Sequence, residues 1–192
     1  MTVDLAESLA TIDAALQRLD RPTLLRALQP GVAGSEVRAS LGSVGLPAPS
    51  ALEELYGWRD GTSTAGVASV DDIHLVPGFY LLSLEDAIAN YRAFAADPRW
   101  EAGWLPIFAN GGGDFYVVDL SSPGESPMRH FRIDEAEHPI EFSSLGAMLA
   151  TVAHGFERGT FFVDPDGYLE MDDLAFGALA AELNPDVEWW RD

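Results

Sequence analysis

Residues 103–120 contain a glycine-rich motif that could bind a phosphate. Gly111, Gly112 and Gly113 lie between two apolar runs, and a glycine loop that opens a helix presents backbone N–H groups to a phosphate. Here the loop leads instead into Asp114 and the strand-forming residues 115–118, and the sequence contains no Lys. An aspartate at the loop exit would also repel a phosphate. We therefore predict a tight turn between two strands, with Asn110-Gly111 as its signal.

The four histidines do not form a zinc motif. They are His74, His130, His138 and His154, and none lies in an H-E-x-x-H arrangement or beside another His at helical spacing. His154 and Glu157 share a helix face, which we interpret as a surface hydrogen bond. The absence of Cys excludes disulfides, thiolate nucleophiles and Cys-ligated metal sites.

Residues 164–173, D-P-D-G-Y-L-E-M-D-D, have a density of side-chain oxygens that would suit calcium. An EF-hand loop has its glycine at the sixth position, whereas Gly167 is fourth, so the spacing fails. Pro165 to Gly167 is instead typical of a turn. Hydrolase patterns such as a nucleophile elbow are also missing. We expect no enzymatic activity, no cofactor and no metal; stoichiometric calcium or zinc after dialysis would contradict this.

Length and composition indicate one folded domain. The chain has 192 residues, of which 47% are hydrophobic, enough to bury a core. No apolar run approaches the ~18 residues of a membrane span. The first 20 residues form an amphipathic pattern with acidic residues, unlike a signal peptide. We expect a cytoplasmic protein without a membrane partner.

The net charge of −20 is unevenly distributed. Residues 1–96 carry twelve acids and six Arg, whereas residues 97–192 carry nineteen acids and five Arg. Such a field repels nucleic acid and attracts basic partners. Solubility and the acidic bias of a high-salt proteome are alternative explanations of the same composition.

Helical and strand periods follow one another in blocks, which indicates the α+β class rather than alternating βαβ units. Helices are predicted at residues 5–19, 22–28, 35–43, 50–58, 83–96, 144–156 and 172–183. Strands are predicted at residues 67–70, 73–76, 79–82, 104–108, 114–120, 128–133, 139–142, 160–163 and 167–171. Ser50 with Glu53, and Ser83 with Asp86, are predicted to cap two of the helices.

Four segments, taken in order, resemble the SUKH superfamily, which includes fungal cell-wall assembly regulators and bacterial proteins encoded beside polymorphic toxins. The motifs are a Leu-Pro elbow, a Trp-x-Asp-Gly helix exit, an aromatic strand leading into Ser-Leu-Glu, and a Gly-Gly-Asp strand start, followed by residues 143–151. In this sequence they are Leu46-Pro47, Trp58 with Asp60-Gly61, residues 79–85, and Gly112-Gly113-Asp114. The resemblance covers about residues 30–155 of a single domain, 1–192. It leaves a helical N-terminal extension, 1–29, and an acidic C-terminal extension, 160–192.

The resemblance implies an α+β fold with a mixed, largely antiparallel central sheet flanked by N- and C-terminal helices. It also implies protein binding without catalysis, since bacterial members are regarded as immunity proteins that neutralise a cognate toxin, often a nuclease. An acidic inhibitor can cover the basic surface with which a nuclease holds nucleic acid. The alternative is a regulatory or scaffold protein like the fungal members, and a small-molecule-binding domain or enzyme would require a pocket. The oligomeric state stays open.

The carboxylates expected to contact a basic partner form a dense cluster outside the core motifs. They are Asp164, Asp166, Glu170, Asp172 and Asp173. A solvated hairpin and helix start is the alternative explanation of this cluster.

Two motif pairs, Asp60-Gly61 and Gly113-Asp114, are expected to serve the fold. In each pair the carboxylate would cap a turn and the glycine would supply a backbone angle that other residues resist. Gly113→Val should then lower the stability by roughly 1 kcal/mol or more. A functional use of Asp114 is the alternative.

Overall fold

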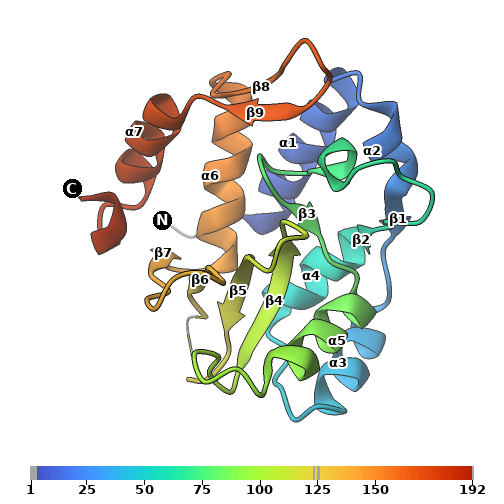
Figure 1. Cartoon of the computed structure of the whole chain (residues 1–192), viewed down its shortest axis with the longest axis vertical. Helices are drawn as coiled ribbons and strands as arrows, with labels where there is room; N and C mark the ends of the chain where they lie inside the picture. Colours follow the sequence, from blue (N-terminus) through green and yellow to red (C-terminus); the bar gives the residue numbers. More distant parts are fainter. Residues whose placement is uncertain (1–3, 123, 125, 192) are drawn as a thin grey trace.

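The computed structural model of the chain describes residues 4–122, 124 and 126–191. Figure 1 follows the elements by colour along the chain. The helices are α1 (Leu5–Arg18), α2 (Pro22–Ala27), α3 (Gly34–Gly42), α4 (Ser50–Trp58), α5 (Leu84–Phe94), α6 (Leu145–Glu157) and α7 (Asp173–Leu183), with the 3-10 turns η1 (Val70–Ile73) and η2 (Glu188–Trp190). The strands are β1 (Leu28–Pro30), β2 (Arg59–Thr62), β3 (Tyr80–Leu81), β4 (Trp104–Ala109), β5 (Phe115–Asp119), β6 (Met128–Phe131), β7 (Ile140–Phe142), β8 (Phe161–Val163) and β9 (Leu169–Met171).

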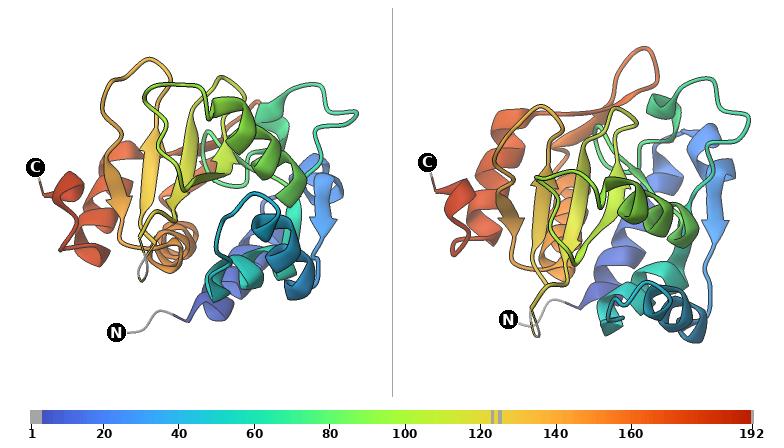
Figure 2. Two further views of the ribbon diagram at one scale, coloured as in Figure 1. Left: turned by 90° about the horizontal axis from the view of Figure 1, so that it is seen from below. Right: turned by 60° about the horizontal axis from the view of Figure 1, so that its bottom comes forward.

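The central sheet has the strand order β3-β4-β5-β6-β7, and its neighbouring strands are antiparallel. The pairs β1–β2 and β8–β9 lie outside this sheet. Figure 2 shows α6 along one face of the sheet with α1 beside it, whereas α7 and η2 lie beyond β7. The predicted α+β class is confirmed, and the described sheet is antiparallel throughout rather than mixed.

The helices on this face bury the apolar stripes that their sequences predict. Helix α1 buries Leu5, Leu9, Ile12 and Leu16, and α6 buries Leu145, Met148, Leu149 and Val152. These positions recur at spacings of three and four, so each stripe lies on one side of its helix. Helix α1 packs on α6, so the N-terminal helix and the C-terminal half of the chain share one core.

An aromatic cluster packs between α5 and the sheet. The ring of Phe94 lies 5.0 Å from that of Phe115 and 5.6 Å from that of Phe131, and both pairs are edge-to-face. Trp100 lies 4.9 Å from Phe131, also edge-to-face. Such geometry adds to the stabilisation from apolar burial. Trp100, Trp104 and Phe115 are buried.

The glycine loop joins β4 to β5, which confirms the predicted strand-turn-strand. The side-chain oxygen of Asn110 accepts hydrogen bonds from the N–H groups of Gly112 (2.7 Å) and Asp114 (3.1 Å). Gly111 and Gly113 have φ angles of 81° and 109°, which non-glycine residues resist. The Asp114 carboxylate accepts from Asn110 Nδ2 and from the Ile133 N–H, both at 2.8 Å. It therefore fastens the turn to the segment after β6.

The strands predicted at residues 67–70 and 73–76 are wrong. Residues 70–73 form the 3-10 turn η1, and residues 67–69 are not in a strand. Ser69 Oγ accepts a hydrogen bond from the Asp71 N–H at 3.2 Å. A local side-chain bond of this kind competes with strand pairing and favours a turn. Ile73, Leu75 and Val76 are buried, whereas Val67 and Val70 are half-buried.

Two helix boundaries also differ from the prediction. Ser50 is the first residue of α4 rather than its cap, and Glu53 forms an ion pair with Arg38 on α3, so the predicted capping box is absent. The second helix ends at Ala27, because residues 28–30 pair with β2 as a strand. In both places a tertiary contact overrides the local signal. The predicted cap at Ser83 is confirmed, since Ser83 Oγ accepts from the Asp86 N–H.

Arg21, between α1 and α2, is 5% exposed and ties three distant segments together. Its guanidinium donates to the backbone carbonyls of His74, Asp71 (2.7 Å) and Gly167 (3.4 Å). Burial lowers the pKa of Arg21, while the charge of Asp72 acts in the opposite direction. A buried cation is unfavourable unless it is hydrogen-bonded, so these carbonyls stabilise the arginine. The same hydrogen bonds fix the positions of residues 71–74 and of Gly167. The turn of the β8–β9 hairpin is thereby anchored to the N-terminal helices.

Gly61→Ala is expected to lower the free energy of unfolding by about 2–4 kcal/mol. The φ angle of Gly61 is 78°, and a Cβ there would lie 2.2 Å from the Ser83 backbone nitrogen. Gly45 has a similar φ of 76° but faces open space, so Gly45→Ala should cost only about 1 kcal/mol. Urea unfolding of the two variants measures the difference. Equal losses would contradict the close approach of the two backbones.

Arg21→Met is expected to lower the free energy of unfolding by about 2–4 kcal/mol, since it leaves buried carbonyls without a donor. Arg18→Met is the matched control, because Arg18 is exposed and its side chain makes no hydrogen bond within the described residues. Chemical unfolding compares the variants, and equal stabilities would show that Arg21 does not hold the loops.

Candidate functional site

The five predicted partner-binding carboxylates lie together on the β8–β9 hairpin and at the start of α7, a segment that we call the acidic hairpin (residues 161–174). The structure gives them two different roles. Asp164 Oδ1 accepts hydrogen bonds from the Asp166 and Tyr168 N–H groups, both at 2.9 Å, and so closes the turn. Asp172 Oδ1 accepts from the Ala175 N–H at 3.0 Å and caps α7. These two carboxylates are therefore occupied by the local fold.

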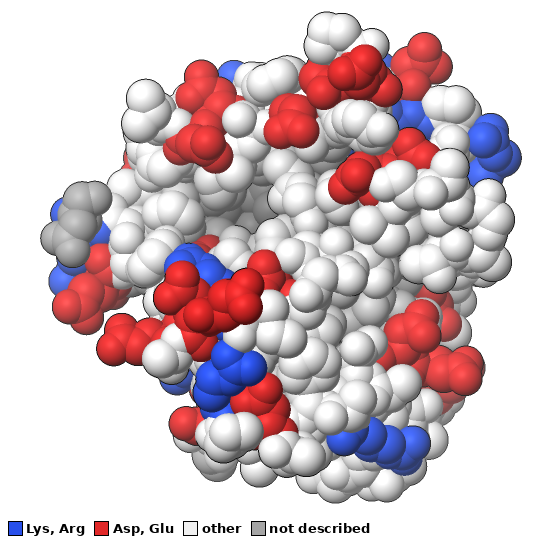
Figure 3. Space-filling model, in the orientation of Figure 1, with Lys and Arg blue, Asp and Glu red and all other residues white. Residues whose placement is uncertain are grey.

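Asp166, Glu170 and Asp173 are exposed, and their carboxylates form no hydrogen bond or ion pair with the described residues. Two large apolar side chains accompany them: Phe162 is 47% exposed and Leu174 is 88% exposed. Phe162 is paired directly with Glu170 across the hairpin. Figure 3 shows carboxylates (red) along the upper edge of the molecule, over this segment. The arrangement combines free negative charge with apolar contact area.

The predicted structural-motif residues lie apart from this surface and contact the fold. Leu46 is buried, whereas the adjacent Pro47 is exposed; Trp58 is the last residue of α4. Asp60 Oδ1 accepts a hydrogen bond from the Leu84 N–H at 2.8 Å and so binds the first turn of α5. Gly61 lets the same strand approach the Ser83 backbone.

A groove of about 1100 Å³ lies at the β7 edge of the sheet, and sequence reasoning missed it. It runs between the β6–β7 loop and η2, and we call it the β7 groove. Its lining includes Glu135 and Glu137 from the loop, Ile140 from β7, and Glu188 and Trp189 from η2. Ile140 and Trp189 are 36% and 42% exposed, respectively.

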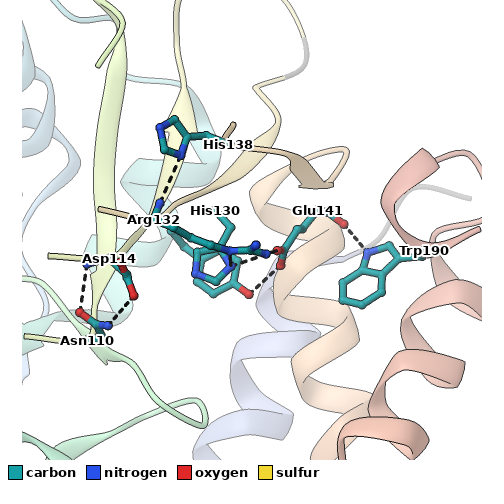
Figure 4. Close-up of polar contacts among 8 residues, drawn as sticks. Asn110, Asp114, His130, Arg132, His138, Glu141 and Trp190 are labelled. Carbon is teal, nitrogen blue, oxygen red and sulfur yellow. Dashed lines mark hydrogen bonds and ion pairs between the residues drawn. The ribbon is translucent and has the colours of Figure 1, made fainter. Parts of the chain in front are cut away.

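A buried carboxylate, Glu141, organises the strands beside this groove (Figure 4). Its side chain is 3% exposed. It accepts from the Tyr116 hydroxyl at 2.7 Å, and it lies 3.0 Å from His130 Nδ1 and 3.3 Å from Arg132 Nη2. Burial, and then the Glu141 charge, raise the pKa of Tyr116 well above its ordinary value, so this hydroxyl remains a donor. The cluster ties β5, β6 and β7 together.

The backbone of the same residue holds the C-terminal tail. The Glu141 carbonyl accepts a hydrogen bond from Trp190 Nε1, and the Trp190 ring packs against Phe142 (5.8 Å) and Phe176 (6.1 Å). An uncovered edge strand would offer its backbone groups to other chains. In this structure η2 covers part of the β7 edge and forms one wall of the groove.

His138 lies in the floor of the groove and is 9% exposed. Its Nδ1 accepts a hydrogen bond from the Arg132 N–H at 3.2 Å. Burial, and then the positive charge of Arg99, lower the pKa of His138, so the neutral ring that this bond requires is favoured. The sequence gives no signal for this role, because His138 and Arg132 are joined only by the β6–β7 loop geometry.

The central part of the chain matches a known protein family. The sequence matches the SMI1 / KNR4 family (SUKH-1) over residues 35–151, from α3 to the middle of α6, and the chain belongs to this family. No curated protein matches the chain. The acidic hairpin and η2 lie outside the matched residues. Within the described part of the chain, no helix is long and apolar enough to cross a membrane.

Glu141→Gln is expected to lower the free energy of unfolding by about 2–4 kcal/mol, because it removes the charge that His130 and Arg132 face while keeping the side-chain volume. The control Glu137→Gln changes an exposed residue of the neighbouring loop and should shift it by no more than about 0.5 kcal/mol. Urea unfolding measures both. A Glu141→Gln variant as stable as the control would contradict the organising role of this carboxylate.

Proposed function

We propose that the chain is a non-catalytic immunity protein that binds a basic toxin domain, such as a nuclease, and covers its active site. The observation that carries this proposal is the acidic hairpin: three free carboxylates beside two exposed apolar side chains, on a SUKH-family chain of net charge −20. Interfaces commonly combine apolar contacts with a polar rim. The proposed site of action is the cytoplasm.

The chemistry of the hairpin favours a basic protein over other partners. Negative charge repels nucleic acid and anionic lipid. A basic protein surface complements the carboxylates and can also bury Phe162 and Leu174, which small cations cannot do. The acidic C-terminal extension, residues 160–192, contains nine acids and one Arg. We propose that this extension adapts the family core to its partner.

Co-expression with the product of the neighbouring upstream gene tests this function. Cells should survive a demonstrably toxic product only when this chain is present. Failure to protect them, or a neighbouring gene that encodes no toxin, would favour the regulatory scaffold found among fungal relatives.

The contribution of the hairpin is tested by the association rate. The variant Asp166→Asn/Glu170→Gln/Asp173→Asn should bind the toxin about tenfold more slowly at low salt, with a smaller change in dissociation, because charge steering acts before contact. Asp164 and Asp172 are left intact because they close the turn and cap α7. Glu36→Gln/Glu54→Gln/Glu101→Gln changes the net charge equally on other surfaces and is the control. Stopped-flow rates that fall equally in the two variants would remove the hairpin as the binding surface.

A further inference from the structure

We infer that the β7 groove is a second contact surface that receives an Arg or Lys side chain of a basic protein segment. This inference rests on the proposed function for the class of partner, and it assigns a separate surface to it. The cationic group would lie against the Trp189 indole and between the carboxylates of the β6–β7 loop and η2. Figure 3 shows acidic side chains on this side of the molecule, interspersed with arginines.

The unpaired charge in the groove is negative. Two arginines line it, but each already forms an ion pair with a carboxylate of the fold. Arg129 Nε lies 2.8 Å from Asp119 Oδ2, and Arg132 Nη2 lies 3.3 Å from Glu141 Oε1. Glu135, Glu137 and Glu188 are exposed, and their carboxylates form no ion pair within residues 4–122, 124 and 126–191. The charge left to attract a ligand is therefore negative, which selects a cation over an anion.

The Trp189 indole gives the groove an aromatic surface. The guanidinium of Arg132 lies 5.0 Å from the centre of the Trp189 ring, so this indole already holds one cation in the structure. Trp189 is nevertheless 42% exposed, and aromatic faces attract guanidinium and ammonium groups. Trp and Arg are also the residue types that dominate binding energy at protein interfaces. The exposed Ile140 supplies apolar floor for the stem of an incoming Arg or Lys.

Charge favours a basic partner protein over a second copy of this chain. A second copy would bring another −20 charge towards the same carboxylates, and like charges oppose such an association.

The groove is also bounded by a tail that is held in place, since Trp190 bonds to the Glu141 carbonyl and Val187 is buried. The surface is thus formed before binding, which limits the entropy lost when a segment docks.

The test uses N-acetyl-argininamide as the probe and follows the indole N–H resonances of the full chain by NMR. The probe should shift the Trp189 resonance saturably, whereas its neutral counterpart N-acetyl-glutaminamide should not. Glu135→Gln/Glu137→Gln/Glu188→Gln should weaken the binding about tenfold. Glu36→Gln/Glu54→Gln/Glu101→Gln changes the net charge by the same three units outside both proposed surfaces and should leave the binding unchanged within about twofold.

Two results would overturn the inference: no saturable shift of Trp189, or equal weakening in the two triple variants, which would show that only the overall charge attracts the probe. Because the probe is not the toxin, neither result decides the co-expression test of the proposed function. If the chain failed to protect cells from the toxin but the probe still shifted the Trp189 resonance, the proposed immunity function would be rejected. The cation-binding groove would be supported.

Discussion

The burial of the Glu141 carboxylate is the constraint on which the C-terminal half of the structure depends. A charge that is 3% exposed is strongly unfavourable unless donors surround it. The Tyr116 hydroxyl and the Arg132 guanidinium donate to it, and His130 Nδ1 lies 3.0 Å from it; the carbonyl of the same residue accepts from Trp190 of the tail. One residue therefore fixes the register of β5 to β7 and the position of η2 together.

Hydrogen bonds from the fold hold the segments that carry the two proposed binding surfaces. Arg21 anchors the turn of the acidic hairpin through the Gly167 carbonyl, and Glu141 anchors η2 through Trp190. Six surface carboxylates form no ion pair with the described residues: Asp166, Glu170 and Asp173 on the hairpin, and Glu135, Glu137 and Glu188 at the groove. Binding residues on a rigid scaffold lose less entropy when a partner docks. The family core and the segments outside the match meet at these anchors.

The sequence predicted those parts of the fold whose signal is local. Apolar spacing located α1 and α6, and strand-forming residues after Gly113 distinguished a hairpin from a phosphate loop. The predictions failed where a distant partner decides the conformation, as at Glu53, which pairs with Arg38 rather than capping α4. The Glu141 cluster had no local signature, because its members come from three strands. The density of acidic residues in the sequence identified the acidic hairpin. Only the structure shows which of its carboxylates accept backbone hydrogen bonds and which are available to a partner.

The central claim is that the C-terminal surfaces, rather than the helices α3 to α5, receive a basic partner. Hydrogen-exchange mass spectrometry of the chain, alone and with its proposed toxin partner, tests this claim most directly. The account predicts slower exchange in peptides covering residues 161–174 and 184–190 and unchanged exchange in α3 to α5. Protection confined to α3 to α5, with the C-terminal peptides unaffected, would contradict it.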